Sequence, residues 1–168
     1  METSKKVQPI GNIESIVTGY RQRGQTIVFT NGCFDLLHVG HARYLQQARS
    51  YGDYLVVGVN SDRSVKTLKG EMRPVVNQDY RAELLAALES VSLVVIFDEL
   101  DPLRLISLVK PDILVKGADW GSEHIIGREF VEQNGGQVIR LPLVPEMSTT
   151  HIINTILDRF GQNEQHRT

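Results

Sequence analysis

The chain has 168 residues, of which 41% are hydrophobic, and carries a formal net charge of −2. A chain of this length can enclose one hydrophobic core, so we expect a single domain over 1–168, with flexible ends at 1–10 and 161–168. The weak net charge argues against a general nucleic-acid or membrane surface. The single cysteine excludes an intrachain disulfide. No apolar run approaches the ~18 residues of a membrane span. The N-terminal segment lacks the apolar core of a signal peptide, which predicts a cytoplasmic protein.

Short runs rich in Val and Ile alternate with longer amphipathic segments. The short runs show little polar alternation, which is typical of buried parallel strands, and they occupy 26–30, 54–59, 92–97, 112–116 and 137–141. Helices are predicted at 12–23, 40–50, 79–88, 101–109, 123–133 and 149–160. The alternation predicts a Rossmann-like α/β fold, a doubly wound five-stranded parallel sheet with helices on both faces. The longest stretch without a predicted element is 60–78, a basic loop of a length that is often functional.

A glycine turn and two histidines follow the first predicted strand, in the sequence NGCFDLLHVGH at 31–41. Ligands of a doubly wound sheet bind outside the carboxyl ends of its strands, and the helix that begins here offers free backbone N–H groups to an anion. His38 and His41 could each donate a hydrogen bond to one phosphate, and Gly32 lets the backbone approach a ligand closely. The alternatives are a metal-binding pair, which no cluster of Cys or carboxylate ligands accompanies, and ordinary polar surface residues.

The stretch GCFDLLHVGH resembles the signature of the nucleotidyltransferase superfamily, whose HxGH motif binds the triphosphate of a nucleotide. Further stretches strengthen the resemblance: KTLKGEMRP, RAELLAAL, LVKGADW and MSTTHII. Together these segments, over about 10–160, are most similar to the adenylyltransferases of ADP-heptose biosynthesis, in their stand-alone form rather than fused to a sugar kinase. At 143–147 the chain lacks the arginine-led segment of the glycerol and choline phosphate cytidylyltransferases.

The resemblance implies a site assembled from several parts of the chain. Its catalytic residues would be His38, His41 and Lys69. The further nucleotide contacts that it implies are Thr30, Asn31, Gly32, Cys33, Phe34, Gly40, Gly117, Asp119, Met147, Ser148, Thr149 and Thr150. The substrate contacts that it implies are Asp35, Lys66, Arg81, Lys116 and Trp120. Asp35 could also order a metal ion through water, or serve the turn alone, and Trp120 could simply fill the rim of the core.

The implied reaction joins D-glycero-D-manno-heptose 1-phosphate and ATP, with Mg²⁺, to give ADP-heptose and pyrophosphate for lipopolysaccharide core or surface-glycan synthesis. A separate sugar kinase would act upstream. The alternatives are a cytidylyltransferase for a polyol or amino-alcohol phosphate such as glycerol 3-phosphate, a nucleotide-binding regulatory module, and a metal-dependent hydrolase. The residues do not choose between ATP and CTP. The helix at 12–23 or the late helix could contribute the interface of a homodimer.

Overall fold

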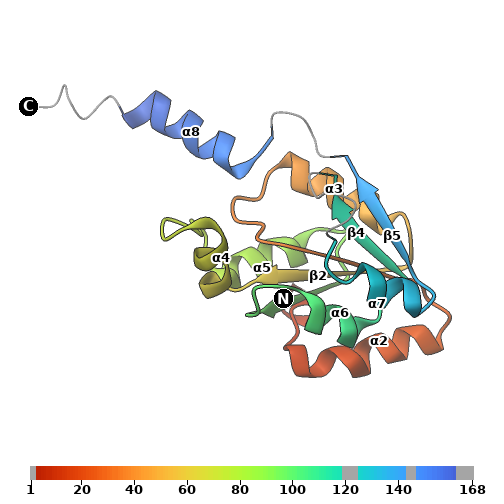
Figure 1. The fold of residues 1–168 in the computed structure, drawn as a ribbon. Helices are drawn as coiled ribbons and strands as arrows, with labels where there is room; N and C mark the ends of the chain where they lie inside the picture. The colour runs from red at the N-terminus through yellow and green to blue at the C-terminus, as the bar shows by residue number, and fades with distance from the viewer. Residues whose placement is uncertain (1–2, 119–124, 143–146, 162–168) are drawn as a thin grey trace, which may run out of the picture.

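The computed structural model describes residues 3–118, 125–142 and 147–161 (Figure 1). Five parallel strands form one sheet in the order β3-β2-β1-β4-β5. They are β1 (Ile27–Gly32), β2 (Tyr54–Asn60), β3 (Leu93–Phe97), β4 (Ile113–Gly117) and β5 (Gln137–Leu141). Each strand begins within one residue of its predicted start, which confirms the predicted sheet. The apolar runs were sufficient to find the strands because both faces of the sheet are covered.

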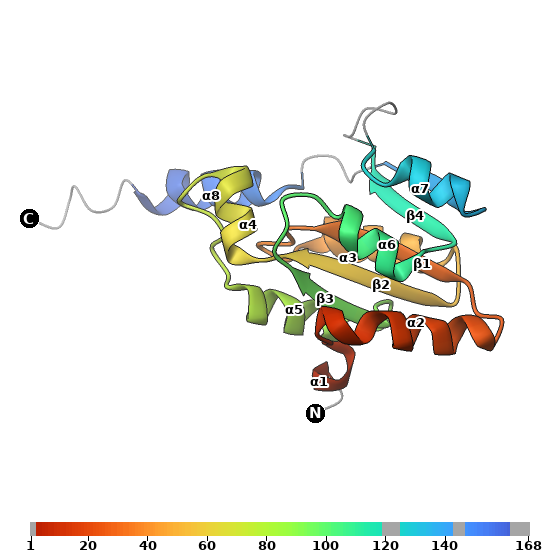
Figure 2. The same cartoon turned by 60° about the horizontal axis from the view of Figure 1, so that its bottom comes forward.

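Helices cover the two faces of the sheet (Figures 1 and 2). Along β1, Phe29 and its neighbour Val28 point to opposite faces and belong to different hydrophobic clusters. The cluster around Phe29 is completed by α2 (Ile13–Gln22), α6 (Leu103–Val109) and α7 (Arg128–Gln133). The cluster around Val28 is completed by α3 (Val39–Arg49) and α5 (Gln78–Ala87). The predicted doubly wound architecture is therefore present.

The stretch predicted as a long basic loop contains a helix, α4 (Asp62–Lys69). Ser61 caps it, because the Ser61 hydroxyl oxygen accepts a hydrogen bond from the Ser64 backbone N–H at 3.1 Å. Val65 is its one buried apolar residue. The apolar periodicity was therefore too weak to reveal the helix, although the cap was visible in the sequence.

Two predicted helices begin later in the structure than the sequence pattern indicates. The helix predicted from residue 101 begins at Leu103, because the Asp101 carboxylate accepts from the Leu103 N–H at 2.9 Å while Pro102 takes the N-cap position. The helix predicted over 123–133 is α7, which begins at Arg128 after Gly127, a glycine with a φ of 90°. Within 1–10 the structure has α1 (Thr3–Lys6) and a bridge from Val7 to Val94 in β3.

The last helix, α8 (Thr149–Phe160), has the predicted bounds. It stands apart from the sheet in Figure 1, and no residue of this helix is buried. The exposed fractions of Ile156, Leu157 and Phe160 are 49%, 60% and 66%. Within the described residues, no helix is long and apolar enough to cross a bilayer.

Candidate nucleotide site

The sheet changes its winding direction between β1 and β4, because β2 and β3 extend it on one side of β1 and β4 and β5 on the other. In doubly wound sheets the ligand crevice lies at the carboxyl ends of the strands at such a switch point. Two polar side chains meet there. The Lys116 ammonium, near the end of β4, donates a hydrogen bond to the side-chain oxygen of Asn31, near the end of β1.

Lys116 is a buried cation, only 9% exposed. Burial lowers the pKa of its ammonium from 10.5 to about 8. No ion pair found in the described part of the chain includes Lys116. A buried ammonium without a carboxylate partner is costly, so this corner of the sheet is suited to an incoming anion.

The two histidines lie against each other at the start of α3. His38 is the N-cap residue, with φ −139° and ψ 172°, and its ring stacks on that of His41 with centroids 3.8 Å apart. The Phe34 ring meets His41 edge-on at 5.2 Å, from a backbone with a positive φ of 47°. Such strained backbone is concentrated at functional sites. Aromatic packing therefore fixes the orientation of both imidazoles.

Both imidazoles have an unsatisfied nitrogen. The Nδ1 atoms of His38 and His41 are buried and have no hydrogen-bond partner among the described residues. Burial lowers the pKa of His38, and burial together with the neighbouring His38 lowers that of His41 to about 4, against a hydrogen bond with the Leu36 backbone. Both rings therefore favour the neutral form in the free protein.

Gly40 explains the spacing between the histidines. A Cβ added at Gly40 would lie 3.0 Å from the His38 ring, so a larger residue would push that ring away from the helix start. The same added atom would lie 3.6 Å from the Cβ of Met147, which places the segment before α8 beside the histidine turn. Two helix starts that are far apart in the sequence thus converge.

The α8 helix begins as the sequence predicts. The Ser148 hydroxyl oxygen accepts from the His151 backbone N–H at 3.1 Å, so this serine caps the helix. Thr149 and Thr150 form the first turn. The first N–H groups of a helix have no partner inside the helix, so this terminus can accept an anion.

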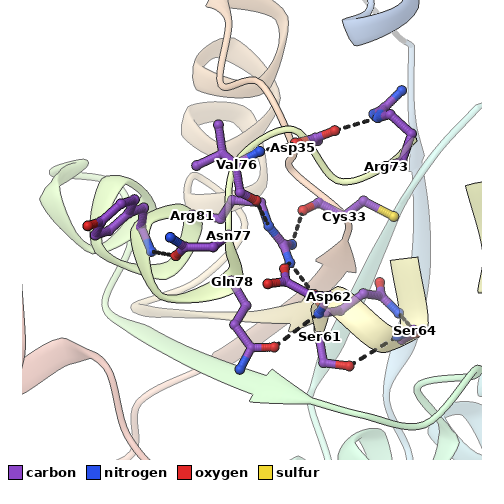
Figure 3. A network of polar contacts seen from close by, with 12 residues as sticks. Cys33, Asp35, Ser61, Asp62, Ser64, Arg73, Val76, Asn77, Gln78 and Arg81 are labelled. Atoms are coloured by element: carbon purple, nitrogen blue, oxygen red, sulfur yellow. Dashed lines mark hydrogen bonds and ion pairs between the residues drawn. The ribbon is translucent and has the colours of Figure 1, made fainter. Parts of the chain in front are cut away.

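Asp35 was predicted to contact the substrate, but both of its carboxylate oxygens accept hydrogen bonds from within the protein. Its Oδ1 accepts from the backbone N–H groups of Val75 and Val76 at 2.8 and 2.9 Å. Its Oδ2 accepts from Arg73 Nε (Figure 3). Burial favours a raised pKa, but the two N–H groups and Arg73 outweigh it and lower the pKa of this carboxyl. With both oxygens occupied, the carboxylate is a poor ligand for a metal ion. It acts in the turn, the alternative that the sequence left open.

Arg81 also differs from the prediction, because its side chain is completely buried. The guanidinium donates to the backbone oxygens of Val76, Cys33 and Asn60 and to an oxygen of Asp62 (Figure 3). These acceptors come from the histidine turn, the end of β2, the start of α4 and the loop before α5. Arg81 therefore joins four segments of the site, and its buried side chain has no face for substrate.

Cations gather around Cys33, in the turn before the histidines. Burial raises the pKa of the half-buried Cys33 thiol, while Lys69, Arg81 and Arg73 act to lower it. Lys69 is exposed in the last turn of α4. The role of Lys69 at the phosphates stays a prediction. Sequence reasoning noticed Arg73 as a loop cation but gave it no role, because its partner Asp35 lies 38 positions away.

The other predicted contacts are spread around this edge. Thr30 is buried in β1 with its hydroxyl 2.8 Å from that of Tyr44, and Gly32 lies beneath the Phe34 ring. Gly117 ends β4, and Lys66 is exposed on α4. Two predicted contacts lie outside the described residues: Asp119 and Trp120. In the described ranges, no group of three or more His, Cys, Asp or Glu side chains is arranged to hold a metal ion.

The fold and these helix starts define a class of protein: a doubly wound α/β domain that binds the phosphates of a nucleotide at its switch point. A profile of the cytidylyltransferase-like family matches residues 29–155, and the chain belongs to this family.

Bacterial relatives are similar over nearly the whole chain. The bifunctional protein HldE of Geobacter metallireducens is 50% identical over 161 residues, which are 96% of this chain and 33% of that protein. HldE of Geotalea uraniireducens is 51% identical over 92% of this chain and 32% of its own length. The chain therefore spans about a third of the curated relatives it matches.

Solved structures show the same fold. A lipopolysaccharide core biosynthesis protein from Thermoplasma volcanium superposes with a TM-score of 0.60 and 30% identity, over 72% of this chain and 98% of that one. A pantoate-β-alanine ligase from Francisella tularensis gives a TM-score of 0.57 at 16% identity, over 90% and 77% of the two chains. The second likeness concerns the fold alone.

Proposed function

We propose that the protein is an adenylyltransferase that joins heptose 1-phosphate and ATP to give ADP-heptose and pyrophosphate. The observation that carries the proposal is the convergence of the stacked His38 and His41 with the start of α8 at the carboxyl edge of the sheet. The identity of about 50% to HldE proteins over nearly the whole chain supports the choice among nucleotidyltransferases. The product would enter lipopolysaccharide core or surface-glycan synthesis.

The reaction is an in-line displacement. A phosphate oxygen of the sugar 1-phosphate attacks the α-phosphorus of ATP, the bond to the bridging oxygen breaks, and pyrophosphate leaves on the opposite side. The protein has mainly to position the reactants and to stabilise developing charge. His38 and His41 contact the phosphates, Ser148 and the following N–H groups hold the β- and γ-phosphates, and Lys69 faces the departing pyrophosphate.

The acceptor lies on the β4 side of the histidines in this proposal. Lys116 meets the sugar phosphate there, because its ammonium is buried at the switch point and the neutral Asn31 side chain is its one hydrogen-bond partner among the described residues. Gly117, at the end of the same strand, leaves room for the nucleoside. Lys66 contributes positive charge from α4.

Mg²⁺ would be held mainly by oxygens of the nucleotide rather than by this chain, and it would supply positive charge to the phosphates. Asp35 does not fit as a ligand, because both of its oxygens already accept hydrogen bonds. ATP and sugar phosphates are cytoplasmic metabolites, so we place the reaction in the cytoplasm. A sugar kinase supplies the acceptor, either as a separate protein or as a fused domain, and a homodimer remains part of the proposal.

The test is pyrophosphate release with heptose 1-phosphate and ATP, run in parallel with CTP and with glycerol 3-phosphate. We expect turnover only with ATP and the sugar phosphate. Preference for CTP and glycerol 3-phosphate would identify a polyol phosphate cytidylyltransferase instead. Nucleotide binding without turnover on any pair would identify a regulatory module.

A further inference from the structure

Arg73 lies in the loop between α4 and α5 and reaches the histidine turn through a single contact. Its Nε donates to the Asp35 carboxylate. The exposed fraction of the Arg73 side chain is 17%, whereas that of Asp35 is zero. Arg73 is therefore anchored by a buried group while part of its own side chain remains accessible.

The anchor is rigid. In addition to Arg73, Asp35 is held by two backbone N–H groups of the same loop, at Val75 and Val76. Figure 3 shows Asp35 between Val76 and Arg73. A carboxylate fixed in this way orients the guanidinium plane, because the plane must contain the Nε–H bond. Asp35 thus selects one direction for the two outer nitrogens of Arg73.

Those outer nitrogens have hydrogen-bonding capacity to spare. Within the described residues, the guanidinium of Arg73 makes no hydrogen bond except that from Nε. Arg81, on the other side of the same turn, differs because four protein oxygens occupy its guanidinium. A planar guanidinium with a free edge matches two oxygens of a phosphate.

The charges of Arg73 and Lys69 both act on the turn that precedes the histidines. Both cations influence the thiol of Cys33, in the turn that precedes the histidines. Lys69 ends α4, and Arg73 follows four positions later, after the turn at Gly70. An anion above the turn would therefore meet two positive charges from one loop.

We propose that Arg73 is a phosphate-binding residue that, together with Lys69, binds the departing pyrophosphate, and that Asp35 is the positioning residue for Arg73. This inference rests on the proposed nucleotidyl transfer, because it concerns the leaving group of that reaction. Negative charge grows on the pyrophosphate as its bond to the α-phosphorus breaks, and an oriented guanidinium stabilises that charge without rearrangement.

The experiment measures pyrophosphate binding directly by calorimetry, and as product inhibition in the forward reaction. Arg73→Gln removes the charge, Arg73→Lys keeps the charge without the fork, and Asp35→Asn removes the anchor. The matched control is Arg104→Gln, which breaks an exposed pair with Glu99 on the outer surface. Circular dichroism and thermal unfolding establish that each variant is folded.

We expect Arg73→Gln to weaken pyrophosphate binding by about tenfold or more, the usual effect of losing a charged hydrogen-bonding partner. Arg73→Lys and Asp35→Asn should weaken it by intermediate factors, with the KM for the sugar phosphate nearly unchanged. Arg104→Gln should bind pyrophosphate as the wild type does.

Unchanged pyrophosphate affinity in a folded Arg73→Gln variant would overturn the inference. So would unfolding of both Arg73 variants, since Arg73 would then serve the fold, or a selective rise in the KM for the sugar phosphate. Because binding is measured without turnover, a wild type that binds pyrophosphate but rejects heptose 1-phosphate would refute the proposed substrate while leaving the Arg73 result readable.

Discussion

Replacing Lys116 with methionine should stabilise the free protein while damaging the site. The pKa of the ammonium falls from 10.5 to about 8 on folding because of burial. A depression of that size corresponds to about 3 kcal/mol of folding free energy lost at neutral pH. Methionine has nearly the same shape without the charge, and the lost hydrogen bond to Asn31 is worth about 1 kcal/mol. A net gain of about 2 kcal/mol is left, or roughly 4–8 °C in Tm.

The pH dependence identifies the cause. The pKa of Lys116 is lower in the folded state than in the unfolded state, so the penalty is complete below pH 8. It fades as the pH rises from 8 to 10.5, because the folded protein releases the proton while the unfolded chain still holds it. Urea unfolding at pH 7 and at pH 9.5 should therefore show a large gain for Lys116→Met at pH 7 and a smaller one at pH 9.5.

Lys66→Met, at an exposed lysine of α4, is the matched control for stability and should change it little at either pH. The same Lys116→Met protein should show a raised KM for the sugar phosphate. Two results would contradict the account: a variant less stable than the wild type at pH 7, or a gain in stability that does not depend on pH. Either would show that Lys116 is a structural hydrogen-bond donor and not an anion-binding residue.

Three further predictions concern the histidines and Arg81. His41→Ala should fold normally and lose about 10²–10³ in kcat, the usual cost of losing one donor to a reacting oxyanion; near-normal kcat/KM would remove His41 from the mechanism. ATP binding at pH 5.5 should take up protons, because His41 has a pKa of about 4 in the free protein and the negative charge of a phosphate bound beside the ring raises it. Calorimetric heats that are identical in buffers of different ionisation enthalpy would contradict this. Arg81→Met should destabilise the fold by about 3–5 kcal/mol, because it leaves the Asp62 carboxylate and three carbonyl oxygens without their donor. Urea unfolding measures this loss of stability. A stable variant in which only the KM changes would instead assign Arg81 to substrate binding.

Local patterns in the sequence were enough for the parts of the fold that local physics decides. The strands are continuous apolar runs, and the bounds of α8 follow from its amphipathic segment, so both were predicted correctly. Helix α4 was missed because it buries a single apolar residue, Val65. The apolar stripe of α8 predicted a helix correctly but not its surroundings, since nothing in a stripe says what it packs against.

The roles of charged residues depended on contacts that sequence spacing does not reveal. Asp35 and Arg81 are of the right types for substrate binding, and the resemblance assigned them to it. In the structure, Asp35 accepts hydrogen bonds from residues 38 to 41 positions away, and Arg81 reaches the carbonyl of Cys33 across 48 positions. Only the folded chain shows that Asp35 and Arg81 are hydrogen-bonded within the protein. His38 and His41, in contrast, each keep a ring nitrogen without a hydrogen-bond partner among the described residues.

The central claim is that the histidine turn and the start of α8 bind the same phosphates. A titration of ¹⁵N-labelled protein with a non-hydrolysable ATP analogue and Mg²⁺, followed by NMR, tests it most directly. The account predicts that the ring nitrogens of His38 and His41 and the backbone amides of Thr149 and Thr150 shift together, with one dissociation constant. Shifts of the histidines with unmoved α8 amides, or two separate affinities, would contradict it.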